Sequence, residues 1–265
     1  MDTRATPLEM PVTPASPTPR LQLDGVGKAF GGRDAIRDIS LTVHQHEFVA
    51  LLGPSGAGKT TLLRCVAGLL NPDHGAVYVA GTDVSELHGR ARRRVAVIFQ
   101  QYNLVGRISA LANVLAGRLG HVPAWRGITR RFERSDKWLA LECLERVGLL
   151  SQAAQRADTL SGGQQQRVAI ARALTQQPDI IVADEPVASL DPSHGAGILE
   201  LLRGICHEQG VSVLCSLHQV HLARQFADRL VGLAEGRVVL NVPAADFSEA
   251  QANALYEIVT YMSLA

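Results

Sequence analysis

The sequence has almost no excess of charge of either sign and few cysteines. Its 26 lysine and arginine residues nearly balance 25 aspartate and glutamate residues, for a formal net charge of +1. Proteins that wrap nucleic acid usually carry a larger basic excess, so no nucleic-acid partner is expected. The four cysteines, Cys65, Cys143, Cys206 and Cys215, lie far apart, without zinc or redox spacing. They predict free thiols in a reducing compartment and no disulfide framework.

Long hydrophobic runs are also missing. No apolar run approaches the ~18 residues needed to cross a bilayer, which argues against a membrane-spanning helix. Residues 1–20 contain five prolines together with charged side chains, and they lack the apolar stretch of a secretory signal. We therefore expect a disordered, proline-rich tail over 1–20 and a cytoplasmic protein.

The order of expected elements favours an α/β fold. The 265 residues are enough for one large or two small domains, and 46% of them are hydrophobic. Short β-like segments come first, over 21–23, 39–43 and 48–52, with a glycine turn at 31–32. Helical spacing dominates from 111 to 150, and βα alternation then returns and ends in a hairpin over 230–240. This order predicts a mostly parallel core, an N-terminal antiparallel β region and an inserted helical region.

The strongest motif is GPSGAGKT at 53–60, which fits the pattern G-x-x-x-x-G-K-[ST] between an expected strand and an expected helix. Glycines allow successive backbone N–H groups to point at phosphate oxygens, and the following helix adds a positive N-terminus. In such a loop, Lys59 contacts the outer phosphates of a nucleotide and Thr60 binds Mg²⁺. The predicted nucleotide-binding residues here are Gly53, Pro54, Ser55, Gly56, Ala57, Gly58, Lys59, Thr60 and Thr61.

A second motif, IIVADE at 180–185, is an apolar run that ends in two acids. Ligands of open α/β sheets bind at the carboxyl ends of the strands. A phosphate-binding loop needs a carboxylate from a neighbouring strand, so we expect Asp184 to hold Mg²⁺, directly or through water. Glu185 should then orient or deprotonate the attacking water.

A third motif, LSGGQ at 160–164, opens an expected helix that continues to Leu174. Ser161 has the chemistry of an N-cap, and Gly162 and Gly163 let backbone amides face an anion. By itself the motif is compatible with simple helix capping. In a chain that already carries a phosphate-binding loop, it is a second candidate phosphate site.

These three motifs, in this order, resemble the ATP-binding-cassette (ABC) ATPase family from Leu21 to about Leu240. The resemblance implies a P-loop NTPase core, with ATP and Mg²⁺ as cofactors. It also matches Gln100 to the family's Q-loop glutamine, Asp191 to its D-loop, His218 to its switch histidine and Phe30 to an adenine-stacking aromatic residue. A tyrosine is commoner in the family at the position of Phe30, but any aromatic ring can stack.

The resemblance further implies the roles of these residues. The implied catalytic residues are Lys59, Gln100, Glu185 and His218. The implied Mg²⁺ ligands are Thr60, Gln100 and Asp184. The further nucleotide contacts come from Phe30, Ser161, Gly162, Gly163, Gln164 and Asp191. In the family, two copies sandwich two ATP molecules, so the signature loop at 161–164 of one copy faces the γ-phosphate bound at 53–60 of the other.

Four further segments, at 99–105, 113–120, 155–158 and 216–220, are similar to the ATP-binding subunits of bacterial phosphonate importers. That likeness implies an ATP-hydrolysing motor on the cytoplasmic face of the inner membrane. The motor would be peripheral, coupled to a separate integral membrane permease and indirectly to a periplasmic solute-binding protein. The expected domains are the tail at 1–20 and one ABC ATPase domain over 21–265, whose helical subdomain is inserted at about 101–165.

Other functions stay open. The solute could be another small one, such as phosphate or phosphite, and a cassette could also regulate or extract instead of importing. In a different class, the chain could be a soluble ABC-type ATPase that acts on DNA or in repair. The short insert between the first and third motifs and the near-neutral charge argue against that class.

Overall fold

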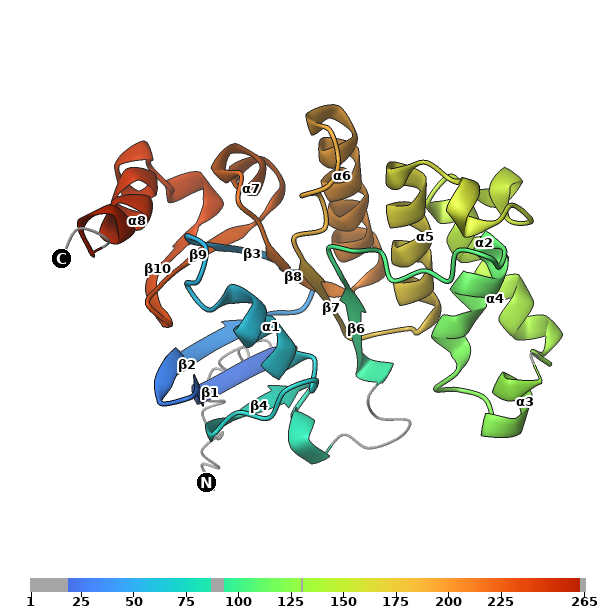
Figure 1. The fold of residues 1–265 in the computed structure, drawn as a ribbon, viewed down its shortest axis with the longest axis horizontal. Coiled ribbons are helices and arrows are strands. Elements are labelled where there is room, and N and C mark those ends of the chain that lie inside the picture. Colours follow the sequence, from blue (N-terminus) through green and yellow to red (C-terminus); the bar gives the residue numbers. More distant parts are fainter. Residues whose placement is uncertain (1–18, 87–92, 130, 263–265) are drawn as a thin grey trace, which may run out of the picture.

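The computed structural model describes residues 19–86, 93–129 and 131–262, so the tail expected at 1–20 lies almost wholly outside the described residues. The described chain forms two β-sheets with helices against them and a separate group of helices at one end (Figure 1). Within these ranges, no helix is both long and apolar enough to cross a membrane. All four cysteines are buried and free, as the sequence predicted.

The first sheet is antiparallel, with the strand order β2-β1-β4-β5. Its strands are β1 (Leu21–Phe30), β2 (Arg33–Val43), β4 (His74–Val79) and β5 (Thr82–Asp83). The turn between β1 and β2 falls at Gly31 and Gly32, both with positive φ, as predicted. The sequence showed only the first residues of β1, because a register shift between Leu23 and Val26 interrupts the alternation of apolar side chains.

The second sheet is parallel except at one edge, with the order β10-β9-β3-β8-β7-β6. Its strands are β3 (Phe48–Leu52), β6 (Val95–Ile98), β7 (Ile180–Asp184), β8 (Ser212–Ser216), β9 (Arg229–Ala234) and β10 (Arg237–Pro243). The predicted hairpin is confirmed as the antiparallel pair β9–β10.

One expectation about this sheet is wrong. The strand that ends at Asp184 was expected beside the strand that leads into the phosphate-binding loop, but β8 lies between β7 and β3. The order of parallel strands is set by the crossover connections between them, and these cannot be read from local patterns.

Strand β3 is buried at every position and divides the core into two clusters. Val49 and Leu51 pack in the cluster that includes α1 (Lys59–Val66) and the first sheet. The alternate residues of β3 pack in the cluster that includes α6 (Pro192–Gln209) and α7 (Val220–Phe226). The continuous apolar run therefore reflects a strand covered on both faces, as predicted.

The inserted helices lie beyond β6, at the right of Figure 1. They are α2 (Ala110–Leu115), α3 (Ala124–Ile128), α4 (Arg134–Arg146) and α5 (Gly162–Thr175). Helices α2, α4 and α5 contact one another. The helical spacing expected between 111 and 150 is present in α4, where Trp138 is 71% exposed and the buried apolar residues are Ala140, Cys143 and Leu144.

A helix that the sequence analysis missed, α8 (Glu249–Met262), follows β10 and contacts β9. Its signal was present. Ser248 Oγ accepts a hydrogen bond from the Gln251 N–H, and Gln251 Oε1 accepts one from the Ser248 N–H, which is the reciprocal capping box of an S-x-x-Q sequence.

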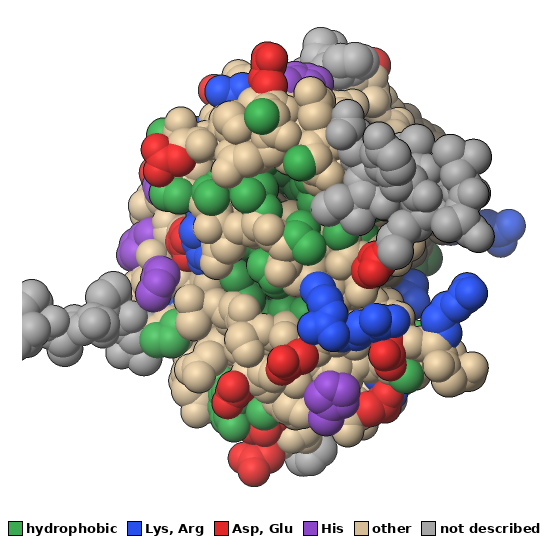
Figure 2. All heavy atoms as spheres, turned by 90° about the vertical axis from the view of Figure 1, so that its left-hand side faces the viewer, with side chains coloured by type: hydrophobic (Ala, Val, Ile, Leu, Met, Phe, Trp, Pro, Cys, Tyr) green, Lys and Arg blue, Asp and Glu red, His purple; other side chains and the backbone are tan. Residues whose placement is uncertain are grey.

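The face shown in Figure 2 is the left-hand side of Figure 1, where α8 and the antiparallel sheet lie. Hydrophobic side chains gather in its middle, and acidic, basic and histidine side chains surround them. On this face the two signs of charge are interspersed, in keeping with the near-neutral balance of the sequence.

Candidate functional site

The loop at 53–60 connects β3 to α1, and its glycines are required by its shape. Gly58 precedes α1 with a φ of 101°, and a Cβ built on it would lie 2.4 Å from the carbonyl oxygen of Ala35. A Cβ on Gly53 would lie 2.2 Å from the carbonyl oxygen of Leu233. Side chains are therefore excluded at both positions, and the positive φ of Gly58 also favours glycine. This geometry agrees with the loop that the motif predicted.

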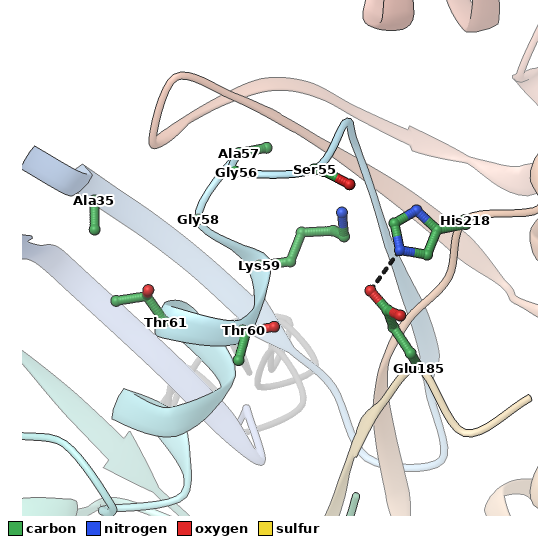
Figure 3. A pocket seen from close by; sticks show the side chains of 10 residues that line it. All are labelled: Ala35, Ser55, Gly56, Ala57, Gly58, Lys59, Thr60, Thr61, Glu185 and His218. Carbon is green, nitrogen blue, oxygen red and sulfur yellow. Dashed lines mark hydrogen bonds and ion pairs between the residues drawn. The ribbon is translucent and has the colours of Figure 1, made fainter. Parts of the chain in front are cut away.

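A hollow of about 240 Å³ lies over this loop (Figure 3). Two side chains from the carboxyl ends of other strands reach it, Glu185 after β7 and His218 after β8. The lining residues are Ala35, Ser55, Gly56, Ala57, Gly58, Lys59, Thr60, Thr61, Glu185 and His218. The structure thus brings together most of the loop with the predicted base and the predicted switch histidine.

Lys59 is only 6% exposed. Its Nζ donates hydrogen bonds to the carbonyl oxygens of Gly53 at 2.7 Å and Pro54 at 3.1 Å. Burial lowers the pKa of the ammonium group, and the nearby carboxylates of Glu185 and Asp184 oppose that effect in part. Burial therefore disfavours the charged form of Lys59, and an anion bound in the hollow would stabilise that form.

Thr60 and Asp184 meet across the sheet. Thr60 Oγ1 donates to Asp184 Oδ1 at 3.2 Å, and Ser216 Oγ donates to the same oxygen at 2.9 Å. The hydroxyl and carboxylate oxygens are hard donors of the kind that Mg²⁺ prefers. Although β7 is not adjacent to β3, the predicted pair of Thr60 and Asp184 therefore lies within hydrogen-bond distance.

Ser216 is a site residue that the sequence analysis missed. It is fully buried at the end of β8, directly opposite Asp184 in the parallel register. It also accepts a hydrogen bond from the Glu185 N–H at 2.9 Å. The signal that could have found it is its place two residues before His218, at the carboxyl end of an apolar strand.

Glu185 and His218 lie together in the hollow. His218 Nε2 contacts Glu185 Oε1 closely, as the dashed line in Figure 3 marks. Glu185 has a φ of 50°, a left-handed backbone that costs energy for a side chain other than glycine. Such outliers gather at functional sites because the surrounding contacts hold them. A carboxylate held beside an imidazole can accept a proton from a water molecule.

Several predicted residues do not line this hollow. Gln100 lines a separate hollow of about 510 Å³, which Ser189 and Asp158 also line. Phe30 lies at the end of β1 and is 52% exposed, and Lys28 Nζ lies 5.8 Å from the centre of its ring. The ring of Phe30 is thus open to stacking from outside. The roles expected of Gln100 and Phe30 stay predictions.

The signature loop also lies apart from the lining of the hollow. Ser161 caps α5: its Oγ accepts from the Gln164 N–H at 3.3 Å, and Gln164 Oε1 accepts from the Ser161 N–H at 3.0 Å. A Cβ on Gly162 would come 3.0 Å from the Tyr102 hydroxyl, so this helix start is closely packed within its own copy. The expected helix N-terminus is therefore present, and its phosphate contact stays a prediction.

Asp191 is placed as the N-cap of α6. Its Oδ1 accepts from the His194 N–H at 3.1 Å, and the His194 ring also contacts its carboxylate. Its nucleotide contact stays a prediction, like that of the signature loop. Ser161 and Asp191 are exposed, and neither is among the residues that line the Lys59 hollow.

Residues 36–188 match the family described as ABC transporter. The chain is 48% identical to the hypophosphite import ATP-binding protein HtxD of Stutzerimonas stutzeri, over 90% of this chain and 71% of the relative. It is 52% identical to the phosphonates import ATP-binding protein PhnC of Frankia casuarinae, over 89% of this chain and 94% of the relative.

Among solved structures, the chain resembles the dimeric ATP-binding cassette MJ0796 in a post-hydrolysis state bound to ADP and Pi. The TM-score is 0.73 and the identity 34%, over 86% of this chain and 100% of that one. The family match covers more than half of the chain, and the relatives align with it almost from end to end. The chain therefore belongs to the ABC transporter family and is one of its ATP-hydrolysing cassettes.

Proposed function

We propose that the chain is the ATP-hydrolysing subunit of an importer for phosphonates or a closely related phosphorus oxyanion. The observation that carries the ATPase part is the hollow itself, in which the Lys59 loop faces the Glu185–His218 pair. The solute part is supported by the names of the relatives, which are phosphonate and hypophosphite import ATP-binding proteins.

In the proposed reaction, the loop at 53–60 binds the nucleotide phosphates through its backbone N–H groups and Lys59. Glu185 accepts a proton from the attacking water at a carboxylate oxygen, while His218 holds that carboxylate in place. Water adds to the γ-phosphorus, and the bond to the bridging oxygen breaks to leave ADP and phosphate.

The oxygen donors that meet below the loop fit a magnesium ion. Thr60 and Asp184 would hold it, with Gln100 as the third proposed ligand. When bound, the ion would neutralise charge on the phosphate oxygens. Gln100 lies in the other hollow, so its contribution requires the segment at 100–106 to approach the phosphates.

We also propose the assembly. Two copies would enclose ATP between the loop at 53–60 of one and the Ser161–Gly163 amides of the other. The domain would extend over 21–265, with the helices at about 101–165 contacting a separate permease. The chain would then be peripheral to the cytoplasmic face of the inner membrane, with a periplasmic binding protein supplying solute and no nucleic acid involved.

Growth on single phosphorus sources tests the solute. Deleting the gene for this chain should abolish growth on methylphosphonate and leave growth on phosphate unchanged. Loss of growth on hypophosphite alone would assign that solute instead. Normal growth of the deletion strain on both compounds would contradict the proposed import function.

A further inference from the structure

The missed helix α8 reaches the nucleotide site through one side chain. Tyr256 donates a hydrogen bond from its hydroxyl to the backbone carbonyl of His218 at 3.3 Å. Burial raises the pKa of that hydroxyl, and a hydrogen bond with the backbone of Gly53 lowers it in part. The Tyr256 hydroxyl thus contacts the backbone of the residue whose ring contacts Glu185.

The position of Tyr256 is fixed by its neighbours. Leu255 is 2% exposed and packs on β9, where a Cβ on Gly232 would come 3.0 Å from its Cδ1. The capping box at Ser248 and Gln251 begins the helix at a defined residue. Helix α8 therefore packs on β9, which pairs with β3 just before Gly53. This packing places the Tyr256 side chain beside His218.

His218 lies on the short connection between β8 and α7, and its ring contacts Glu185. The Leu217 N–H is held by the carbonyl oxygen of Leu51 at 3.0 Å, on the strand side of the connection. On the helix side, Gln219 is the N-cap of α7 and makes no side-chain capping bond. The Tyr256 hydroxyl supplies a restraint to the carbonyl between these two residues.

We propose that Tyr256 is a positioning residue for ATP hydrolysis. Its hydroxyl holds the His218 backbone carbonyl, so that the imidazole faces Glu185. The separation of 3.3 Å is longer than usual for two oxygens. The inference rests on the proposed ATP hydrolysis, and it assigns to α8 a part in that reaction.

The test is Tyr256→Phe, which keeps the ring and removes only the hydroxyl. We expect kcat for ATP hydrolysis to fall about three- to tenfold, the effect of losing one neutral hydrogen bond. The KM for ATP should change less than twofold, because the phosphate contacts of Lys59 are retained. Tyr78→Phe, a half-buried tyrosine on β4 of the other sheet, is the matched control and should leave both constants unchanged.

The same substitution in a His218→Ala background shows whether Tyr256 acts through His218. Single-turnover rates should then be the same with Tyr and with Phe at position 256. An unchanged kcat in Tyr256→Phe would overturn the inference, as would an equal fold loss in both backgrounds or a lowered Tm with unaltered kinetics. A wild-type chain that hydrolyses no ATP would contradict the proposed function itself.

Discussion

The backbone N–H of Glu185 donates to the hydroxyl of Ser216 at 2.9 Å, which fastens the proposed base to the next strand of the sheet. The same hydroxyl donates its proton to Asp184 Oδ1 at 2.9 Å. The buried Ser216 hydroxyl therefore donates to Asp184 and accepts from the backbone of Glu185, and these two hydrogen bonds fix the positions of both acidic residues. It also stabilises the left-handed backbone of Glu185, where φ is 50°.

Ser216→Ala should lower both stability and activity. It leaves the Glu185 N–H without its acceptor, so the free energy of unfolding should fall by about 1–3 kcal/mol. Release of Glu185 should lower kcat about tenfold, measured as phosphate release at saturating ATP.

Ser212→Ala is the matched control for this prediction. Ser212 is also fully buried on β8, and its hydroxyl donates to the His44 carbonyl at 2.8 Å, away from the hollow. It should lose comparable stability and keep the wild-type kcat. Equal kcat values for the two variants would show that Ser216 has only a structural role.

Lys59→Met should separate folding from nucleotide binding. Burial lowers the pKa of Lys59 in the folded chain, so between that value and 10.5 the unfolded chain binds more protons. In that pH range, the free energy of unfolding of the wild type should therefore increase with rising pH. Lys59→Met should not show this increase. Urea unfolding at a series of alkaline pH values measures it.

Adding Mg-ATP gives the second half of that test. A ligand that binds only the folded state stabilises it, so the wild-type Tm should rise with nucleotide concentration. Lys59→Met should show no such rise, while its Tm without nucleotide stays near that of the wild type. A normal nucleotide-dependent rise in Lys59→Met would contradict the role given to Lys59.

Glu185→Gln should trap a dimer in ATP. The substitution keeps the shape of the side chain, removes its basicity and relieves repulsion against the triphosphate. We expect a dimer in size-exclusion chromatography with Mg-ATP and a monomer without nucleotide. Adding Ser161→Arg should abolish the shift, because the larger cation would fill the proposed phosphate site. If the double variant still dimerises with ATP, Ser161 is only the cap of α5.

Local patterns predicted the parts of the site that depend on local backbone geometry. The glycines of the loop at 53–60 and the N-cap at Ser161 are each set within a few residues. The buried strands were also predictable, because a continuous apolar run such as β3 indicates a strand covered on both faces. The capping box at Ser248 carried equal information, and its helix was missed because no motif was expected there.

Contacts between distant segments could not be predicted in the same way. The place of β8 between β3 and β7 depends on crossover order, so the sequence did not single out Ser216 as the partner of Glu185. The exposure of Trp138 depends on which side of α4 meets α5, and helical spacing alone leaves that side open.

The most direct test of the account is to mix two inactive variants. Lys59→Ala removes a loop contact and Ser161→Arg blocks a signature loop, so neither homodimer should hydrolyse ATP. A hybrid dimer retains one site with an intact loop from one copy and an intact signature from the other. With random pairing, half of the dimers are hybrids with one of two sites intact, so the mixture should recover about a quarter of the wild-type rate. A mixture that hydrolyses ATP no faster than the sum of its two components would contradict a site shared between two copies.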